Sequence, residues 1–228
     1  MISNRLKILA DYVKKEDIVG DVGTDHGFIP IYLIEENKAD KIIASDLNQG
    51  PLDNAKQELL SKNLLDRVDL RLGGGLEPYK AGEIDTVIIA GMGGKLIKTI
   101  LVEGEQHIKY LKKLILQPMQ GVYELRKWIL DNGYKIVDED LIYENNIFYE
   151  IIVAIKGESQ KYNDNDLEFG YYMLKKHVEV SKAFLDMKIE KNENIVNDIV
   201  NHGSSMSQMS IEKFKSKIKR YYEVRKCL

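Results

Sequence analysis

Two aspartates lie at the ends of short apolar runs, where an α/β protein can hold ligand-binding residues. Asp21 ends the short apolar run 17–21, and Asp46 ends the apolar run 41–46, which closes 23 positions beyond Gly23. If both runs are parallel strands, their carboxyl ends meet at one edge of a sheet, where open α/β folds bind ligands. Asp46 then has the spacing expected of a carboxylate that accepts hydrogen bonds from both hydroxyls of a ribose. Asp21 can accept hydrogen bonds from an ammonium group.

The turn after the first run favours a ligand without a phosphate. Residues 21–27 read Asp-Val-Gly-Thr-Asp-His-Gly, so the middle glycine of the G-x-G-x-x-G dinucleotide turn is missing. Asp25 would place like charge against a pyrophosphate, whereas S-adenosylmethionine carries a sulfonium cation and no phosphate. We therefore expect S-adenosylmethionine rather than the nicotinamide cofactor of a dehydrogenase. An ordinary strand-to-helix turn is the alternative interpretation, because an isolated Asp-x-Gly also occurs there.

Two further turns belong to the same predicted edge. Residues 90–94 are Ala-Gly-Met-Gly-Gly, and glycines at this density permit positive φ and close approach of a ligand. A plain tight turn is the competing interpretation. Gln117, which precedes Pro118, offers both a donor and an acceptor to a base edge, although it can equally cap backbone groups.

The elements that must position these turns alternate between strand and helix. Apolar residues at helical spacing and helix-starting residues predict helices over 4–13, 27–37, 52–63, from 95, and over 122–132. Short apolar runs predict strands over 17–21, 41–46, 68–72, 84–90, 114–117, 134–144 and 147–156. The last two strands form a hairpin through Asn145 and Asn146. The expected fold class is therefore α/β, with a mixed sheet of about seven strands.

The last third of the chain follows a different pattern. Polar and turn-forming residues over 157–166 predict a linker, and an apolar seam with nearly heptad spacing follows it. The seam contains Leu174, Val178, Leu185, Ile189, Ile195 or Val196, and Ile199. After a turn at Gly203-Ser-Ser, a second stripe contains Ile211, Phe214, Ile218, and Tyr221 or Tyr222. A first helix of about 30 residues spans about 45 Å, so we expect an antiparallel helical hairpin that projects as an arm. The predicted domains are 1–158 and 159–228.

Composition indicates the kind of protein and where in the cell it is expected. The 228 residues carry a formal net charge of −3 and are 44% hydrophobic, which predicts a globular protein with a sizeable core. No apolar run approaches the roughly 20 residues that cross a bilayer, and the opening residues lack the apolar core of a signal peptide. We expect a cytoplasmic protein without membrane contact. The single cysteine, Cys227, excludes an internal disulfide, and with scattered histidines no metal is expected.

A basic stretch lies at the end of the second stripe. Residues 211–228 contain seven lysines and arginines against two glutamates. A solvated helix face is one interpretation of this excess, and a surface that contacts RNA phosphates is the other. We expect a monomer or a weak dimer.

In their order along the chain, these motifs resemble the bacterial tRNA methyltransferases that modify N1 of adenine 22. The matching residues are Asp-Val-Gly-Thr-Asp-His at 21–26, Gly50-Pro51, Ile89-Ala-Gly-Met-Gly-Gly94 and Leu114-Ile-Leu-Gln-Pro118. The resemblance covers about residues 3–156, and the helical hairpin is similar to that family's C-terminal domain. It implies a Rossmann-like class I methyltransferase domain, S-adenosylmethionine as cofactor and tRNA as substrate.

Two positions depart from the family pattern. Gly74 stands where the family usually has an aspartate expected at the cofactor's adenine, and Met119 stands where an asparagine commonly follows the Gln-Pro pair. These departures motivate one alternative, a homologue that binds RNA without catalysis. A second alternative is a methyltransferase that acts on another RNA or on a small molecule.

The resemblance implies that the neutral N1 of an adenine attacks the sulfonium methyl group. Because N1 already carries a lone pair, orientation and electrostatic stabilisation should matter more than a strong base. N1 lies on the Watson–Crick edge, so the base must leave its pair and enter a pocket. The expected substrate-side residues are Asp25, His26, Gln117 and Pro118. The expected cofactor-binding residues are Asp21, Gly23, Thr24, Asp46, Leu47, Gly74, Gly75, Ala90, Gly91, Met92 and Gly93. Candidates for stacking on the base, unless they belong to the core, are Phe28, Tyr143 and Tyr149.

Overall fold

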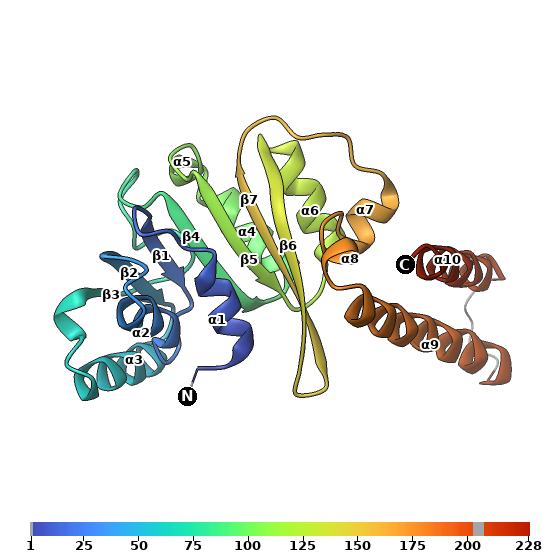
Figure 1. The fold of residues 1–228 in the computed structure, drawn as a ribbon, viewed down its shortest axis with the longest axis horizontal. Helices are drawn as coiled ribbons and strands as arrows, with labels where there is room; N and C mark the ends of the chain where they lie inside the picture. Colours follow the sequence, from blue (N-terminus) through green and yellow to red (C-terminus); the bar gives the residue numbers. More distant parts are fainter. Residues whose placement is uncertain (1, 203–207) are drawn as a thin grey trace.

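A mixed sheet of seven strands organises the part of the chain that the structure, a computed structural model, describes: residues 2–202 and 208–228 (Figure 1). The strands are β1 (Ile18–Val22), β2 (Lys41–Asp46), β3 (Val68–Leu72), β4 (Thr86–Met92), β5 (Lys113–Pro118), β6 (Tyr134–Glu144) and β7 (Ile147–Lys156). Their order in the sheet is β3-β2-β1-β4-β5-β7-β6. β1 to β5 run parallel, and β7 pairs antiparallel with β5 and β6. The predicted α/β class and mixed sheet are confirmed.

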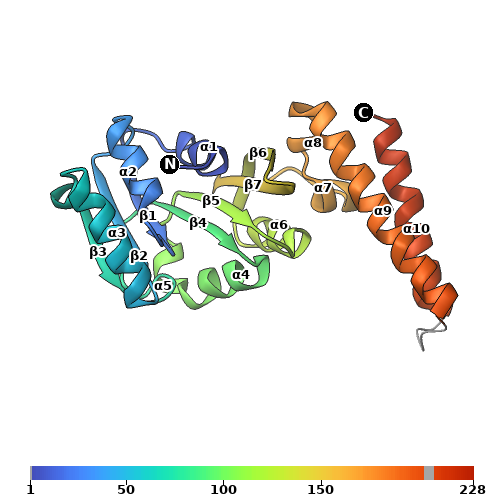
Figure 2. The same cartoon turned by 90° about the horizontal axis from the view of Figure 1, so that it is seen from below.

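Helices cover both faces of this sheet (Figure 2). They are α1 (Asn4–Asp11), α2 (Phe28–Glu35), α3 (Gln49–Ser61), the 3-10 helix η1 (Leu65–Arg67), α4 (Gly94–Glu103), α5 (Glu105–Ile108) and α6 (Val122–Asp131). One buried cluster joins the sheet to α1, α2 and α3 through Leu9, Leu33 and Leu59. A second joins the other face to α4 and α6 through Ile97 and Leu125. Packing on both faces fixes where the strands end.

The C-terminal segment forms the expected arm (Figures 1 and 2). Its helices are α7 (Asp164–Phe169), α8 (Met173–Lys176), α9 (Val178–His202) and α10 (Gln208–Lys226). α9 and α10 lie side by side and project away from the sheet. Phe169, Leu185, Ile189 and Tyr221 form a small core between these elements. The predicted turn at Gly203-Ser-Ser lies outside the described residues.

Two boundaries in this segment differ from the sequence-based expectation. His177 has φ −129° and ψ 64°, which is not helical, so Leu174 belongs to α8 and α9 has 25 residues rather than about 30. The predicted linker 157–166 is also too long. Asn163 accepts the N–H of Asp166 at 3.0 Å, and the Asp166 carboxylate accepts the N–H of Asn163 at 2.8 Å. This reciprocal cap starts α7 inside the expected linker.

A buried ion cluster fixes the start of the C-terminal segment to the sheet. Arg126 is fully buried and donates to Glu139 at 2.7 Å and to Glu150 at 2.9 Å. It also donates to the backbone oxygen of Leu167 at 3.1 Å, while the N–H of Tyr172 donates to Glu139 at 3.0 Å. α7 and α8 are therefore anchored on the sheet, and α9 and α10 project from that anchor.

The division into domains 1–158 and 159–228 stays a prediction. Among residues 2–202 and 208–228, no helix combines the length and apolar character needed to cross a membrane. Within the same described residues, no group of three or more His, Cys, Asp or Glu side chains could hold a metal ion.

Candidate active site

The carboxyl ends of β1 and β2 bring the two predicted carboxylates, Asp21 and Asp46, to one edge of the sheet. The backbone oxygen of Ser45 accepts hydrogen bonds from the N–H groups of Gly23 and Thr24, both at 2.9 Å. These bonds make the chain turn immediately after β1. Gly23 has φ 76°, a left-handed conformation that favours glycine, so the turn lies between the two carboxylates.

Asp21 is a buried carboxylate with an unsatisfied oxygen. Its exposed fraction is 3%, and its Oδ2 has no hydrogen-bond partner within the described residues. Burial raises the pKa of the Asp21 carboxyl to about 6. The neighbouring Thr24 hydroxyl opposes this rise in pKa, and the weaker repulsion from Asp46 adds to it. The hydroxyl of Tyr79 holds this strand end by donating to the backbone oxygen of Asp21 at 3.0 Å. Because an unpaired buried carboxylate is costly, this position fits a cationic ligand group.

Asp46 is held in a fixed orientation by the backbone. Its Oδ1 accepts the N–H of Asn48 at 3.0 Å, and its Oδ2 accepts the N–H of Asp25 at 3.3 Å. The residue is 8% exposed. Each carboxylate oxygen keeps a further lone pair, so Asp46 can accept two more hydrogen bonds. This arrangement suits the adjacent hydroxyls of a ribose.

An apolar surface follows directly after Asp46. Leu47 is 70% exposed, and a Cβ on Gly74 would lie 3.1 Å from Leu47 Cδ1. Gly75, with φ 55°, continues the turn after β3. Leu47 and the two glycines thus lie together, and they can take the flat face of a purine without a side-chain carboxylate.

The glycine-rich turn after β4 leaves open space on one side. Ala90, Gly91 and Met92 are the last residues of β4, and Gly93 is the N-cap of α4. Gly91 has φ 76°, and a Cβ built on it would meet no atom within 4 Å. A Cβ on Gly23 would lie 2.6 Å from Met92 Cε. The turn therefore packs against the β1 turn through Met92 and offers room for a ligand at Gly91.

Asp25 and His26 form the rim of the site. Asp25 has φ 51°, which is uncommon and strained for a residue with a side chain. The His26 ring stacks on Phe28 at a centroid distance of 5.3 Å, and its Nε2 lies 3.7 Å from Asp25 Oδ1. The side chains of Asp25 and His26 are 65% and 43% exposed, so both can meet a substrate. Thr24 lies behind them, with a buried Oγ1 that has no partner among the described residues.

Gln117 is engaged inside the protein. Its Oε1 accepts the N–H of Gly91 at 3.2 Å and a hydrogen bond from the Arg5 guanidinium, and its Nε2 donates to the backbone oxygen of Pro118 at 3.1 Å. The residue is fully buried. In this structure Gln117 caps backbone groups, which was the alternative to contact with a base edge.

Arg5 contacts the site although the sequence patterns do not predict it. This residue of α1 lies 112 positions before Gln117, and its guanidinium also stands 4.9 Å from the centroid of the Tyr149 ring. Glu144 holds the start of α1 in place by accepting the N–H of Asn4 at 2.9 Å. A single arginine in a predicted helix gives no signal of these contacts, because they depend on tertiary packing.

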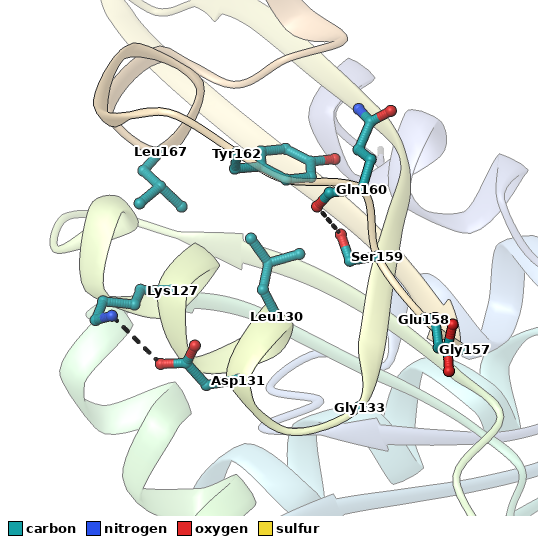
Figure 3. Close-up of a pocket in the computed structure, with 10 residues that line it drawn as sticks. All are labelled: Lys127, Leu130, Asp131, Gly133, Gly157, Glu158, Ser159, Gln160, Tyr162 and Leu167. Atoms are coloured by element: carbon teal, nitrogen blue, oxygen red, sulfur yellow. Dashed lines mark hydrogen bonds and ion pairs between the residues drawn. The ribbon is translucent and has the colours of Figure 1, made fainter.

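A separate cavity lies at the other edge of the sheet (Figure 3). Its lining includes Leu130, Gly157 and Tyr162. Ile155, near the end of β7, pairs with Lys113 at the start of β5. This cavity is therefore at the amino ends of the parallel strands, and the carboxylates of β1 and β2 take no part in it.

The open α/β sheet with acidic ends on β1 and β2 is the architecture of a nucleoside-cofactor enzyme. A model described as a methyltransferase domain matches residues 2–152. The chain belongs to this methyltransferase family, which excludes the alternative of a nicotinamide-dependent dehydrogenase.

Relatives narrow the class further. The tRNA (adenine(22)-N(1))-methyltransferase of Bacillus subtilis strain 168 is 36% identical over 157 residues, which are 69% of this chain and 66% of that protein. Streptococcus pneumoniae Sp1610, solved in complex with S-adenosyl-L-methionine, is 32% identical with a TM-score of 0.88, and the match covers 99% of this chain and 100% of that one. M. capricolum TrmK, solved with S-adenosyl-homocysteine, is 26% identical with a TM-score of 0.85, and the match covers 99% of this chain and 98% of that one. The resemblance inferred from the motifs is confirmed.

Proposed function

We propose that this chain transfers the methyl group of S-adenosylmethionine to N1 of adenine 22 of tRNA. The observation that carries the proposal is the buried Asp21 carboxylate, whose Oδ2 has no partner among the described residues, beside Asp46 at the strand ends of a methyltransferase fold. The tRNA (adenine(22)-N(1))-methyltransferase activity of the Bacillus subtilis relative and the S-adenosyl-L-methionine bound to Streptococcus pneumoniae Sp1610 support it.

The chain's own residues fit the parts of this cofactor. Asp21 would accept hydrogen bonds from the ammonium group, with Gly23 and Thr24 shaping the turn around it. Asp46 would accept both ribose hydroxyls. Leu47, Gly74 and Gly75 would face the adenine, and the turn of Ala90, Gly91, Met92 and Gly93 would leave room at Gly91. When bound, the cofactor supplies an electrophilic methyl group on a sulfonium cation.

On the substrate side, the residues orient and stabilise rather than remove a proton. The attacking N1 is neutral and becomes positively charged as the bond to carbon forms. The exposed carboxylate of Asp25 can stabilise that charge or bind the amino group of the base, and His26 stands beside it. Gln117 and Pro118 would act through the backbone that they hold, since the Gln117 side chain is already bonded.

For tRNA engagement, we assign phosphate contact to α10. Lys213, Lys215 and Lys219 are exposed, and they form no ion pair with any described residue. Lys217 and Arg225, in contrast, pair with Glu168 and Asp186. The three unpaired lysines leave a positive surface on the arm, which suits a polyanion. A cytoplasmic location and a monomer or weak dimer remain predictions that accompany this proposal.

Radiolabelled methyl transfer tests the proposal directly. The protein is incubated with labelled S-adenosylmethionine and unmodified tRNA, and the digested nucleosides are separated. We expect 1-methyladenosine with wild-type tRNA and none when adenine 22 is replaced by guanosine. Labelled 1-methyladenosine from both tRNAs would refute the assigned position, and no transfer despite cofactor binding would refute the activity.

A further inference from the structure

A cleft of about 1250 Å³ lies between the arm and the sheet domain. The tip of the β6–β7 hairpin contributes Tyr143 and Phe148 to its lining, and α9 contributes Phe184 and Met187. The hairpin and α9 meet where the Phe148 ring packs on the Phe184 ring at a centroid distance of 5.4 Å. Met119, which follows β5, belongs to the floor. In Figure 1 the β6–β7 hairpin extends below the rest of the sheet, and α9 begins to its right. The lining of the cleft thus comes from the β6–β7 hairpin, from α9 and from the segment that follows β5.

The lining exposes large apolar side chains. Tyr143 is 55% exposed, Met119 47%, Ile147 44% and Met187 38%. These four side chains come from three separate chain segments and share one cleft. Apolar side chains that gather on a concave surface, rather than being scattered, indicate an interaction site.

The cleft floor continues into the turn that we assign to the cofactor. The N–H of Met119 donates to the backbone oxygen of Met92 at 2.8 Å, and the N–H of Gly94 donates to the backbone oxygen of Gln120 at 2.7 Å. Met119 and Gln120 both line the cleft. A molecule that reaches the β4 turn with one nucleotide can therefore place its neighbours in the cleft.

Of the three aromatic stacking candidates, Tyr143 is the most accessible. Phe28 already stacks on His26, and the Arg5 guanidinium covers Tyr149 at 4.9 Å. Tyr143 is backed by Phe148, at a centroid distance of 4.5 Å. This support holds the ring rigidly while leaving more than half of the residue exposed, which suits a stacking platform.

The charges of the cleft disfavour phosphate as its occupant. Carboxylates outnumber amino groups in its lining: Glu124, Glu150, Glu168, Glu179, Asp186 and Glu190 against Lys188, Lys191 and Lys217. Lys188 lies over the Phe184 ring at 4.6 Å. A surface without positive excess does not attract a phosphate backbone, whereas stacking on an aromatic ring does not depend on charge.

We propose that this cleft binds unstacked bases of the RNA next to the target adenine, with Tyr143 as the stacking ring and Met187 of α9 as a second apolar contact. This inference rests on the proposed function, because it takes RNA as the substrate. It divides the RNA contacts in two: α10 binds phosphates, and the cleft binds bases. The arm thereby contributes to base recognition through α9.

The test compares Tyr143→Ala with Tyr143→Phe in the full-length protein. Loss of one stacked base weakens binding about 5- to 150-fold, so we expect tRNA affinity to fall by that range in Tyr143→Ala and to recover in Tyr143→Phe. Tyr110→Ala is the matched control, since Tyr110 is 46% exposed and lies before β5. Affinity for S-adenosylmethionine should stay unchanged in all three variants. The salt dependence of tRNA binding should also stay unchanged in Tyr143→Ala, because no phosphate contact is lost.

Met187, the α9 residue in the cleft, provides a second and independent test. Met187→Ala should weaken tRNA binding, and Val200→Ala should not, because Val200 is 63% exposed on the same helix but does not line the cleft. Wild-type tRNA affinity in both Tyr143→Ala and Met187→Ala would overturn the inference while leaving methyl transfer intact. A reduced salt dependence in Tyr143→Ala would also overturn it, by indicating phosphate contact. If wild-type protein neither binds nor methylates tRNA, the proposed function fails instead.

Discussion

Replacing Asp21 with asparagine should separate folding from cofactor binding. Raising the carboxyl pKa from 3.8 to about 6 costs the folded protein about 3 kcal/mol wherever Asp21 is ionised. The cost is present above about pH 6 and is relieved as the pH falls toward about 4, because the folded protein then binds the proton more tightly than the unfolded chain does. A buried amide without partners costs about 1–3 kcal/mol itself. Asp21→Asn should therefore leave stability at neutral pH unchanged or raise it by up to about 2 kcal/mol.

Cofactor affinity should change in the opposite direction. Removing one partner of a buried charge pair costs about 2–5 kcal/mol, so the dissociation constant for S-adenosylmethionine should rise at least about 30-fold. In the wild-type protein, affinity should fall about tenfold from neutral pH to pH 5, because Asp21 must lose its proton to bind an ammonium group. The Asp21→Asn variant should lack that fall.

Calorimetry across this pH range and urea denaturation measure the two effects. Asp66→Asn is a control, because Asp66 is exposed in η1 and lies outside the site. Wild-type affinity in Asp21→Asn, or an identical pH dependence in both proteins, would refute the assignment of Asp21 to a cationic ligand group.

Four other variants test the ion cluster of Arg126, the turn after β1, the contact between Arg5 and Gln117, and the lysines of α10. Arg126→Ala should destabilise the fold by about 3–5 kcal/mol in urea denaturation, because it leaves Glu139 and Glu150 buried without their cation. Gly23→Ala should cost about 1–2 kcal/mol of stability from its left-handed φ and weaken binding of S-adenosylmethionine in calorimetry. Arg5→Ala should lower kcat about tenfold with little change in cofactor affinity, because Gln117 loses a charged hydrogen-bond donor and the turn after β4 loosens. An unchanged kcat would contradict this role of Arg5. The double change Lys213→Glu with Lys215→Glu should weaken tRNA binding and flatten its salt dependence in filter binding, and an unchanged salt slope would contradict phosphate contact by α10.

Local patterns were enough to predict the sheet and the residues at its edge. The strands 41–46, 68–72, 134–144 and 147–156 have the predicted bounds, because turn residues or charged residues mark the ends of each run rich in apolar residues. The hairpin turn was equally clear, since Asn145 and Asn146 adopt the positive φ values that such turns require.

Contacts between distant segments could not be predicted in this way. The bond from Arg5 to Gln117 and the anchoring of α7 by Arg126 depend on which helices pack against the sheet. The break at His177 coincides with another such contact, between the His177 ring and Asp140 of β6. Sequence periodicity carries no information about such partners.

A crystal structure of this protein with S-adenosylmethionine tests the central claim most directly. We predict the ammonium group of the ligand within hydrogen-bonding distance of Asp21 Oδ2, and both ribose hydroxyls on Asp46. A ligand bound at any other place, or a ligand bound here that leaves Asp21 Oδ2 without a hydrogen-bond partner, would contradict the account.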